Sequence, residues 1–403
     1  MKYTEQEVLQ FVDEEDVKFI RLAFCDVFGN QKNISIMPGE LKRAFEHGIA
    51  IDAWSIPGFN NEIRSDLFLR PDPSTLVILP WRSEHGRVVR MFCDILYPDG
   101  SVFPADTRYI LKKAVEAASD AGCRFKFGAE LEFYLFNRDE HGNATKTPYD
   151  NAGYMDIAPC DKGENIRREI CLTLDGMGIT PESSHHEEGP GQNEIDFRYS
   201  DPLTAADNAI TFCNVVKTIA NRNGVAADFS PKPLENLPGN GMHINFSIEQ
   251  NNEYMSLESA IGGVLSHIDA MTLFLNPTEE SYRRLGKDKA PRYISWSTEN
   301  RSQLIRIPAA FDEFRRAELR SPDPCANPYI AFALLIYAAL EGIQNNLKPP
   351  SSADINLYTA SESVLSGFSH LPITLEEAKS ISGESSFIKA VMPSEIIAAY
   401  INI

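Results

Sequence analysis

Apolar and polar side chains alternate most clearly in the segment FKFGAELEFYLF, residues 125–136. Because successive side chains of a strand point to opposite faces, this segment predicts a strand with one apolar face and one face carrying Glu130 and Glu132. Two carboxylates on one face repel each other unless a cation lies between or beside them. A divalent metal ion is the simplest cation that would offset this repulsion.

Further short segments show the same alternation, with charged or polar residues opposite apolar ones. They are ESSHHEE (182–188), GPGQNEIDFRYS (189–200), NGMHINFS (240–247), LIRIP (304–308) and RAELRS (316–321). Each segment has the length and spacing of a half-buried strand. We therefore expect a sheet with one face lined by potential ligands.

The pattern before residue 106 differs from the pattern after it. A hairpin (17–36), a short helix (41–49) and strands (75–81, 88–96) predict a small β-rich domain, whereas residues 51–72 lack periodicity and predict a loop. The connector YPDGSVFPAD then marks a boundary between domains of residues 1–105 and 106–403. Amphipathic or apolar helices are predicted at 107–122, 163–178, 201–224 and 326–347, with short helices in the tail, 373–403.

Composition excludes several classes of function. Apolar residues make up 43% and charged residues 24% of the chain, as in globular proteins, and there is no apolar run long enough to span a membrane. A net charge of -19 argues against nucleic acid or an anionic membrane as a partner. The N-terminus, MKYTEQEVLQ, does not resemble a signal peptide, and the seven cysteines show no CxxC spacing. We therefore expect a cytoplasmic protein with reduced thiols.

The polar residues of these strands suggest phosphoryl transfer. Several glutamates with one histidine suit Mg²⁺ or Mn²⁺ better than structural zinc, and many converging carboxylates indicate two ions. Arginines can bind phosphates and carboxylates through two parallel hydrogen bonds, and five lie in this half of the chain: Arg284, Arg301, Arg306, Arg316 and Arg320. Carboxylates, metal and arginines together indicate a nucleotide-dependent reaction.

Five segments, in order, resemble the signature segments of the glutamine synthetase family. They are GAELEFYLF, SHHEEGPGQNEIDF, GNGMHINFS, NRSQLIRIP and RRAELRSPDPCANPY, and the resemblance runs from about Val17 to about Pro349. It implies an α+β fold, with an N-terminal β-grasp domain followed by a catalytic half-barrel of curved antiparallel sheet and helices. It also implies a homo-oligomeric ring with active sites shared between subunits, and ATP-dependent formation of an amide from glutamate and ammonia.

The resemblance implies a role for each matching residue. Glu132, Glu187 and Glu194 match the ligands of one metal ion, and Glu130, His243 and Glu318 those of a second. Gly239, Arg284 and Arg320 match glutamate-binding residues. Glu182, Asn245, Ser247, Arg301, Arg306 and Arg316 match residues that bind ATP or its transferring phosphoryl group. Asp52, Arg301 and Arg320 match catalytic residues, Asp52 being an ammonium carboxylate on a loop that completes the neighbouring subunit's site.

Departures from the family pattern cluster around the amine. Lys289 occupies the place of a flap glutamate that helps deprotonate ammonium, and Pro238 replaces an asparagine that contacts glutamate. Ala53 and Trp54 replace a small Gly-Ser pair beside Asp52, and the usual C-terminal extension has no counterpart, which leaves oligomer size open.

Three hypotheses follow from these departures. Asp288 takes the flap role in an ordinary glutamine synthetase; or the enzyme is a γ-glutamyl-amine ligase that accepts an organic primary amine or another γ-carboxyl donor; or the chain is an inactive structural or regulatory relative. The six filled metal-ligand positions argue against the last hypothesis.

Overall fold

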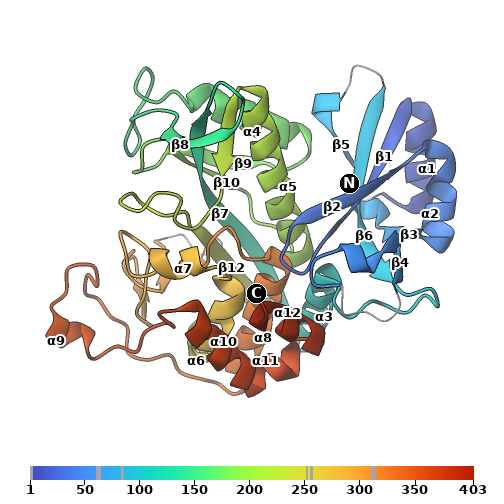
Figure 1. Ribbon diagram of the computed structural model, residues 1–403. Coiled ribbons are helices and arrows are strands. Elements are labelled where there is room, and N and C mark those ends of the chain that lie inside the picture. Colours follow the sequence, from blue (N-terminus) through green and yellow to red (C-terminus); the bar gives the residue numbers. More distant parts are fainter. Residues whose placement is uncertain (1–2, 60–64, 83–85, 251–252, 255–256, 310–314) are drawn as a thin grey trace.

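The computed structural model describes residues 3–59, 65–82, 86–250, 253–254, 257–309 and 315–403, and contains two sheets (Figure 1). The N-terminal sheet has the strand order β2-β1-β6-β4-β3, with β5 paired to β6. Its strands are β1 (Val17–Cys25), β2 (Gln31–Ile36), β3 (Ile49–Asp52), β4 (Asp66–Pro71), β5 (Val77–Ile78) and β6 (Arg87–Leu96), and its helices are α1 (Glu5–Glu14) and α2 (Leu41–His47). The predicted hairpin is confirmed as the antiparallel pair β1 and β2.

One prediction for this domain is wrong. The segment predicted as a loop, 51–72, contains strand β4, which pairs with β3 and β6. In β4, Leu67 and Leu69 are buried while Asp66 and Arg70 are exposed. The strand therefore has the usual alternation, but it lies at the end of a long segment that otherwise lacks periodicity.

The second sheet has the order β14-β15-β16-β12-β7-β10-β9, with β8, β11 and β13 at its margins. Its strands are β7 (Cys123–Arg138), β8 (Ala144–Pro148), β9 (Pro181–His186), β10 (Gln192–Phe197), β11 (Val225–Asp228), β12 (Met242–Gln250), β13 (Glu253–Tyr254), β14 (Trp296–Thr298), β15 (Ile305–Ile307) and β16 (Ala317–Leu319). β7 is the longest strand and pairs antiparallel with β10 on one side and β12 on the other. The predicted polar strands thus lie in one sheet.

Helices cover the apolar face of this sheet. The helices that follow the N-terminal domain are α3 (Thr107–Asp120), α4 (Glu164–Gly176), α5 (Pro202–Arg222), α6 (Glu258–Leu275), α7 (Glu279–Arg284), α8 (Pro328–Gln344), α9 (Glu362–Leu365), α10 (Leu375–Glu384), α11 (Ser386–Val391) and α12 (Ser394–Ile401). Of these, α3, α5 and α8 contact β7 directly, whereas α10 and α11 pack on α6. Phe127 of β7 stacks on Phe332 of α8 with ring centroids 4.5 Å apart. On the same face, Phe133 contacts Phe212 of α5. The predicted α+β class is confirmed, and in the described part of the chain no helix is both long and apolar enough to cross a bilayer.

The backbones of α6 and α8 approach each other closely at two glycines. A Cβ atom on Gly263 would lie 2.1 Å from the carbonyl oxygen of Ala338, and one on Gly342 would lie 2.1 Å from that of Ser259. Both clashes involve backbone atoms, which cannot rotate away. We therefore expect Gly263→Ala to lower the free energy of unfolding by about 1–3 kcal/mol in urea denaturation.

Gly176, at the end of α4, is the matched control for this prediction. A Cβ atom there meets no atom within 4 Å, so Gly176→Ala should leave stability unchanged or raise it slightly. Equal urea midpoints for the two variants would show that the helix contact does not require glycine.

A buried arginine links the N-terminal sheet to the helices behind the second sheet. Arg108, in the first turn of α3, is 4% exposed and donates hydrogen bonds to Asp72 (2.9 Å) and Asp94 (3.2 Å) of the N-terminal domain. It also donates two bonds of 3.1 Å to Asp207 of α5. Tyr329 of α8 donates to the same Asp207 carboxylate at 2.6 Å. This network fixes the N-terminal sheet against the helices behind the second sheet.

Candidate active site

Strand register places the polar side chains of the second sheet in three cross-strand rows. Neighbouring rows are two residues apart along each strand, so all three lie on the same face, opposite the helices. The rows are His185, Glu194 and Glu132; Ser183, Asp196, Glu130 and His243; and Asn245, Glu318 and Arg306. Residues that are distant in sequence therefore become neighbours through pairing alone.

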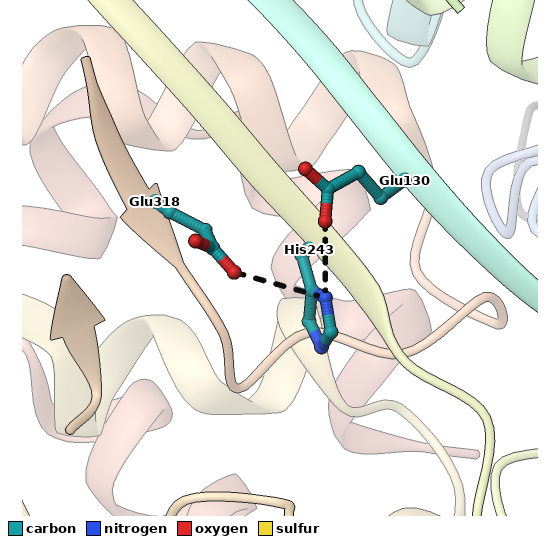
Figure 2. Close-up of side chains that lie close together, drawn as sticks. All are labelled: Glu130, His243 and Glu318. Carbon is teal, nitrogen blue, oxygen red and sulfur yellow. Dashed lines mark hydrogen bonds and ion pairs between the residues drawn. The ribbon is translucent and has the colours of Figure 1, made fainter. Parts of the chain in front are cut away.

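Glu130, His243 and Glu318 form one compact group of potential metal ligands (Figure 2). Their ligand atoms lie within 4.8 Å of one another. The His243 Nδ1 atom is 3.4 Å from Glu130 Oε2 and 3.8 Å from Glu318 Oε1, so both carboxylates face the same ring nitrogen. Two carboxylates and one imidazole suit a hard divalent ion, as the sequence predicts for these residues.

Glu194 is the centre of a second set of carboxylates. Its ligand atoms lie within 4.8 Å of those of Glu132 and His243, and also within 4.8 Å of those of His185 and Glu187. The residues predicted for the other metal ion are thus gathered around Glu194, and His185 joins them. His185 was not predicted as a ligand; its Nε2 atom is 2.9 Å from Glu187 Oε1.

The electrostatics of these residues indicate excess negative charge. Burial and the neighbouring Glu132 carboxylate raise the pKa of Glu194 well above its ordinary value, and burial raises the pKa of Glu132. Burial would also raise the pKa of Glu130, but the hydrogen bond and charge of His243 lower it to about 2. Carboxylates this close favour a bound cation. The residues present therefore fit a divalent ion, and no ligand has to move far to reach one.

Two arginines neutralise the third carboxylate of the compact group. Glu318 is fully buried and accepts hydrogen bonds of 2.6 Å from Arg306 Nε and from Arg320 Nη1. The hydrogen bonds from two guanidinium groups hold the Glu318 carboxylate in a fixed position. Arg320 and Arg306 are thereby oriented at the edge of the metal-ligand group.

A cavity of about 640 Å³ opens over the three rows. The predicted residues that line it are Glu130, Glu132, Glu187, Glu194, Gly239, His243, Arg284, Arg301, Arg306, Arg316 and Arg320. A smaller adjoining cavity of about 100 Å³ is lined by Glu182, Asn245 and Ser247, together with Arg316. Arg316 Nε donates to Asn245 Oδ1 at 2.8 Å, so one arginine contacts both cavities. The residues predicted for glutamate, phosphates and nucleotide lie side by side.

Asp52 lies elsewhere in the chain. It ends strand β3 of the N-terminal sheet and accepts hydrogen bonds from Trp54 N (3.0 Å) and Ser55 Oγ (2.9 Å). It is not among the described residues that line the large cavity. A contribution of Asp52 to a neighbouring subunit's site stays a prediction.

The flap, residues 286–290 between α7 and β14, closes one side of the cavity. Lys289 forms an ion pair with Glu188, and its ammonium group lies 5.7 Å from the centre of the Tyr154 ring. Asp288 pairs with Lys232 at 2.7 Å. Glu188 and Tyr154 also line the cavity, but neither was predicted from the sequence. For Glu188 the available signal was its position directly after Glu187.

Two family models match the chain over nearly its whole length. The model described as "Glutamine synthetase, catalytic domain" matches residues 104–403, and the one described as "Glutamine synthetase, beta-Grasp domain" matches residues 16–98. The chain belongs to the glutamine synthetase family. The resemblance drawn from five sequence segments is thereby confirmed, as is the expected β-grasp and catalytic-domain fold of this family.

Known members of the glutamine synthetase family are similar over their full length. The chain is 43% identical to a glutamine synthetase of Clostridium saccharobutylicum, covering 99% of this chain and 94% of that protein. It is also 43% identical to one of Methanosarcina mazei, covering 99% of this chain and 92% of that protein. A solved complex of GmaS with ADP superposes with a TM-score of 0.88 at 27% identity, covering 98% of this chain and 94% of GmaS.

Proposed function

We propose that this chain synthesises glutamine from glutamate and ammonia at the expense of ATP. One observation carries the proposal: strand register brings Glu130, His243 and Glu318 into one ligand group, next to the carboxylates around Glu194 and below a cavity lined by arginines. Full-length relatives at 43% identity are glutamine synthetases, which favours this activity over the organic-amine and inactive alternatives.

The metal-ligand residues would hold two or more Mg²⁺ or Mn²⁺ ions. One ion would bind to Glu130, His243 and Glu318, and another to Glu132, Glu187 and Glu194, where His185 is a further candidate ligand. Bound there, the ions would offset the charge of the phosphoryl oxygens during transfer.

The arginines would position the two substrates. We assign the phosphate chain of ATP to Arg301, Arg306 and Arg316, which line the large cavity. Arg316 also borders the small cavity, whose residues Glu182, Asn245 and Ser247 are predicted to bind the nucleotide. The complex of GmaS with ADP supports a nucleotide site in this fold. Arg284 and Arg320 would bind glutamate. At Gly239 a Cβ atom would lie 2.4 Å from the Pro231 carbonyl oxygen, which explains the glycine beside them.

The reaction would proceed in two steps. A γ-carboxylate oxygen of glutamate attacks the terminal phosphorus of ATP, and ADP leaves. Ammonia then attacks the acyl carbon and loses one proton to the departing phosphate or to solvent, the bond to the phosphate oxygen breaks, and glutamine and phosphate are released. Guanidinium groups at the cavity wall stabilise the charge that moves between these oxygens.

The flap lysine is compatible with ammonia as the acceptor. Lys289 alone would repel ammonium, but its ion pair with Glu188 offsets the charge. The carboxylate of Asp288 is engaged by Lys232, which argues against Asp288 as the substitute for a flap glutamate. We propose that Glu188 provides the compensating negative charge at this end of the cavity.

Assembly and domain limits belong to the same proposal. We propose domains of residues 1–105 and 106–403, a homo-oligomeric ring, and a contribution of Asp52 to a neighbouring site. The two family models, which match residues 16–98 and 104–403, support the domain limits. The exposed side chain of Trp54, next to Asp52, is consistent with a contact between copies.

A direct assay tests the proposed activity. Purified protein is incubated with ATP, Mg²⁺ or Mn²⁺ and glutamate, and with ammonia or one of several primary amines; phosphate and amide products are both measured. Glutamine formed with ammonia is the expected result. Amide formed only with an organic amine would establish the γ-glutamyl-amine alternative, and no turnover by folded protein would favour an inactive relative.

Reversing the flap charge tests the role of Lys289. Lys289→Glu places a second carboxylate beside Glu188, so we expect the KM for ammonium to fall by about fivefold, as for about 1 kcal/mol of partly screened attraction. Lys287→Glu changes the same charge two residues away, in the same cavity wall, and is the control. An unchanged KM in Lys289→Glu, or an equal fall in both variants, would contradict a local effect.

A further inference from the structure

The hydroxyl of Tyr358 lies between two loops that border the large cavity. Its oxygen is 2.7 Å from the carbonyl oxygen of Lys289, in the flap, and 2.8 Å from that of Arg301. Tyr358 belongs to the long segment between α8 and α10, which extends away from the body of the molecule at α9 (Figure 1). A residue outside the sheet thus contacts both the flap and the loop that carries a phosphate-binding candidate.

The segment around Tyr358 is held firmly on the Arg301 side. The Ile355 carbonyl accepts hydrogen bonds from Asn300 Nδ2 (2.8 Å) and Gln303 Nε2 (2.9 Å), and Leu357 N donates to Ser302 Oγ at 2.9 Å. These bonds fix the backbone on both sides of residue 356 against the loop at 300–303. The backbone that carries the Tyr358 ring is therefore held in place by these hydrogen bonds.

The flap is held from the opposite side of the cavity by side chains. The ion pairs of Lys289 with Glu188 and of Asp288 with Lys232 pull it toward the β9–β10 turn and the loop after β11. Tyr358 binds the flap backbone from the other direction. The Tyr358 hydroxyl donates to the two carbonyl groups and also interacts with the Arg320 guanidinium group, so it links the flap, the Arg301 loop and Arg320.

We propose that Tyr358 is a positioning residue that keeps flap residues 286–290 closed against the Arg301 loop while the acyl phosphate awaits ammonia. This inference rests on the proposed function. If the flap opens, water attacks the acyl carbon in place of ammonia and the bond to the phosphate oxygen breaks. Glutamate and phosphate leave, the two protons of water pass to these products or to solvent, and ATP is consumed without amide formation.

Tyr358→Phe removes the hydroxyl and keeps the ring. The measured quantity is the amount of phosphate released per glutamine formed, which is one for a fully coupled enzyme. We expect this ratio to rise at least about twofold in Tyr358→Phe, as expected for the loss of one hydrogen bond that holds the flap. ADP affinity, measured by calorimetry, should stay within about twofold, because the substitution adds and removes no charge.

Tyr293→Phe is the matched control. Tyr293 lies just after the flap and packs against Phe368, and its hydroxyl has no hydrogen bond within the described part of the chain. Its phosphate-to-glutamine ratio should equal that of the wild type. A ratio that rises equally in both variants would overturn the assignment to the Tyr358 hydroxyl.

Limited proteolysis provides a readout independent of activity. Trypsin cleaves after lysine, and Lys287 and Lys289 both lie in the flap. Cleavage at these two positions should accelerate in Tyr358→Phe and not in Tyr293→Phe. Faster cleavage throughout the chain would indicate general destabilisation and count against the inference, as would unchanged cleavage.

The two hypotheses fail in different ways. If the wild type forms no glutamine, the proposed function is wrong, whatever trypsin shows. If the wild type forms glutamine but Tyr358→Phe keeps both the coupling ratio and the cleavage rate of the wild type, the flap inference is wrong and the proposed function stands.

Discussion

Replacing Glu194 with alanine is expected to abolish glutamine formation, lowering kcat/KM by at least about 100-fold. Glu194 belongs to three groups of potential ligands among the described residues: one with Glu132 and His243, one with His185 and Glu187, and one with Glu130 and Asp196. Its loss therefore weakens the binding of a divalent ion more than the loss of a peripheral carboxylate. Glu132→Ala should have a similar effect, for the same reason.

The stability of the Glu194→Ala variant provides an independent measurement. In wild-type protein, added Mn²⁺ or Mg²⁺ should raise the melting temperature, because the ion binds the folded ligand groups only; in Glu194→Ala this rise should be largely lost. Glu140→Ala, at the exposed turn after β7, is the control and should behave as wild type. A full metal-induced rise in Glu194→Ala would exclude Glu194 as a ligand.

Without divalent ions, the stability of the folded protein should change with pH in a defined direction. The pKa of Glu194 is raised in the folded state by burial and by Glu132, so Glu194 stabilises the fold below the ordinary value of 4.5. This contribution is lost as pH rises through the folded-state pKa. In chelator, wild-type stability should therefore fall with rising pH above 4.5 more steeply than that of Glu194→Ala.

Replacing Arg108 with methionine is expected to lower the free energy of unfolding by about 3–5 kcal/mol. Arg108 is the shared partner of Asp72, Asp94 and Asp207, where the N-terminal sheet packs against helices α3 and α5. Methionine fills a similar volume but removes the cationic partner of Asp72 and Asp207, whereas Asp94 keeps its ion pair with Lys112. Urea denaturation measures the loss.

The control for Arg108 is an exposed arginine with a carboxylate partner. Arg43 pairs with Glu40 at 2.7 Å on the surface of α2, and Arg43→Met should change stability by no more than about 1 kcal/mol. Arg108→Lys keeps the charge but not the forked geometry of the guanidinium group. Its free energy of unfolding should lie between those of Arg108→Met and Arg43→Met. An Arg108→Met variant as stable as Arg43→Met would show that the three carboxylates are stabilised by solvent instead.

The sequence predicted most of the sheet but not all of the helices. Strands β7, β10 and β12 alternate over enough residues to be recognised, and the predicted faces agree with the observed ones. Helix α6 was not predicted: Ser266, His267 and Asp269 interrupt its apolar residues, which show no clear helical period. Strand β4 was missed because it lies at the end of a long segment that otherwise lacks periodicity.

The candidate site could be predicted only in part. Alternation shows which face of a strand carries Glu130, but not which strand lies beside it; the family resemblance supplied that information for the metal ligands. His185 and Glu188 depend on how β9 turns into β10, which no local pattern shows. Asp52 lies in the N-terminal sheet and does not line the large cavity, so its predicted contribution to a neighbouring subunit's site is not tested by the described residues of one chain.

Because the catalytic groups are aligned by pairing between strands, the connecting segments are free to diverge. An inserted residue inside β7, β10 or β12 would turn every later ligand of that strand toward the helices, whereas loop closure costs little more as a loop lengthens. Evolution can therefore change the length or the charge of connecting segments, such as the flap and the segment between α8 and α10 that carries Tyr358, without moving Glu130, His243 or Glu318. Substrate specificity can therefore change through the loops that border the cavity, while the candidate metal ligands on the strands stay the same.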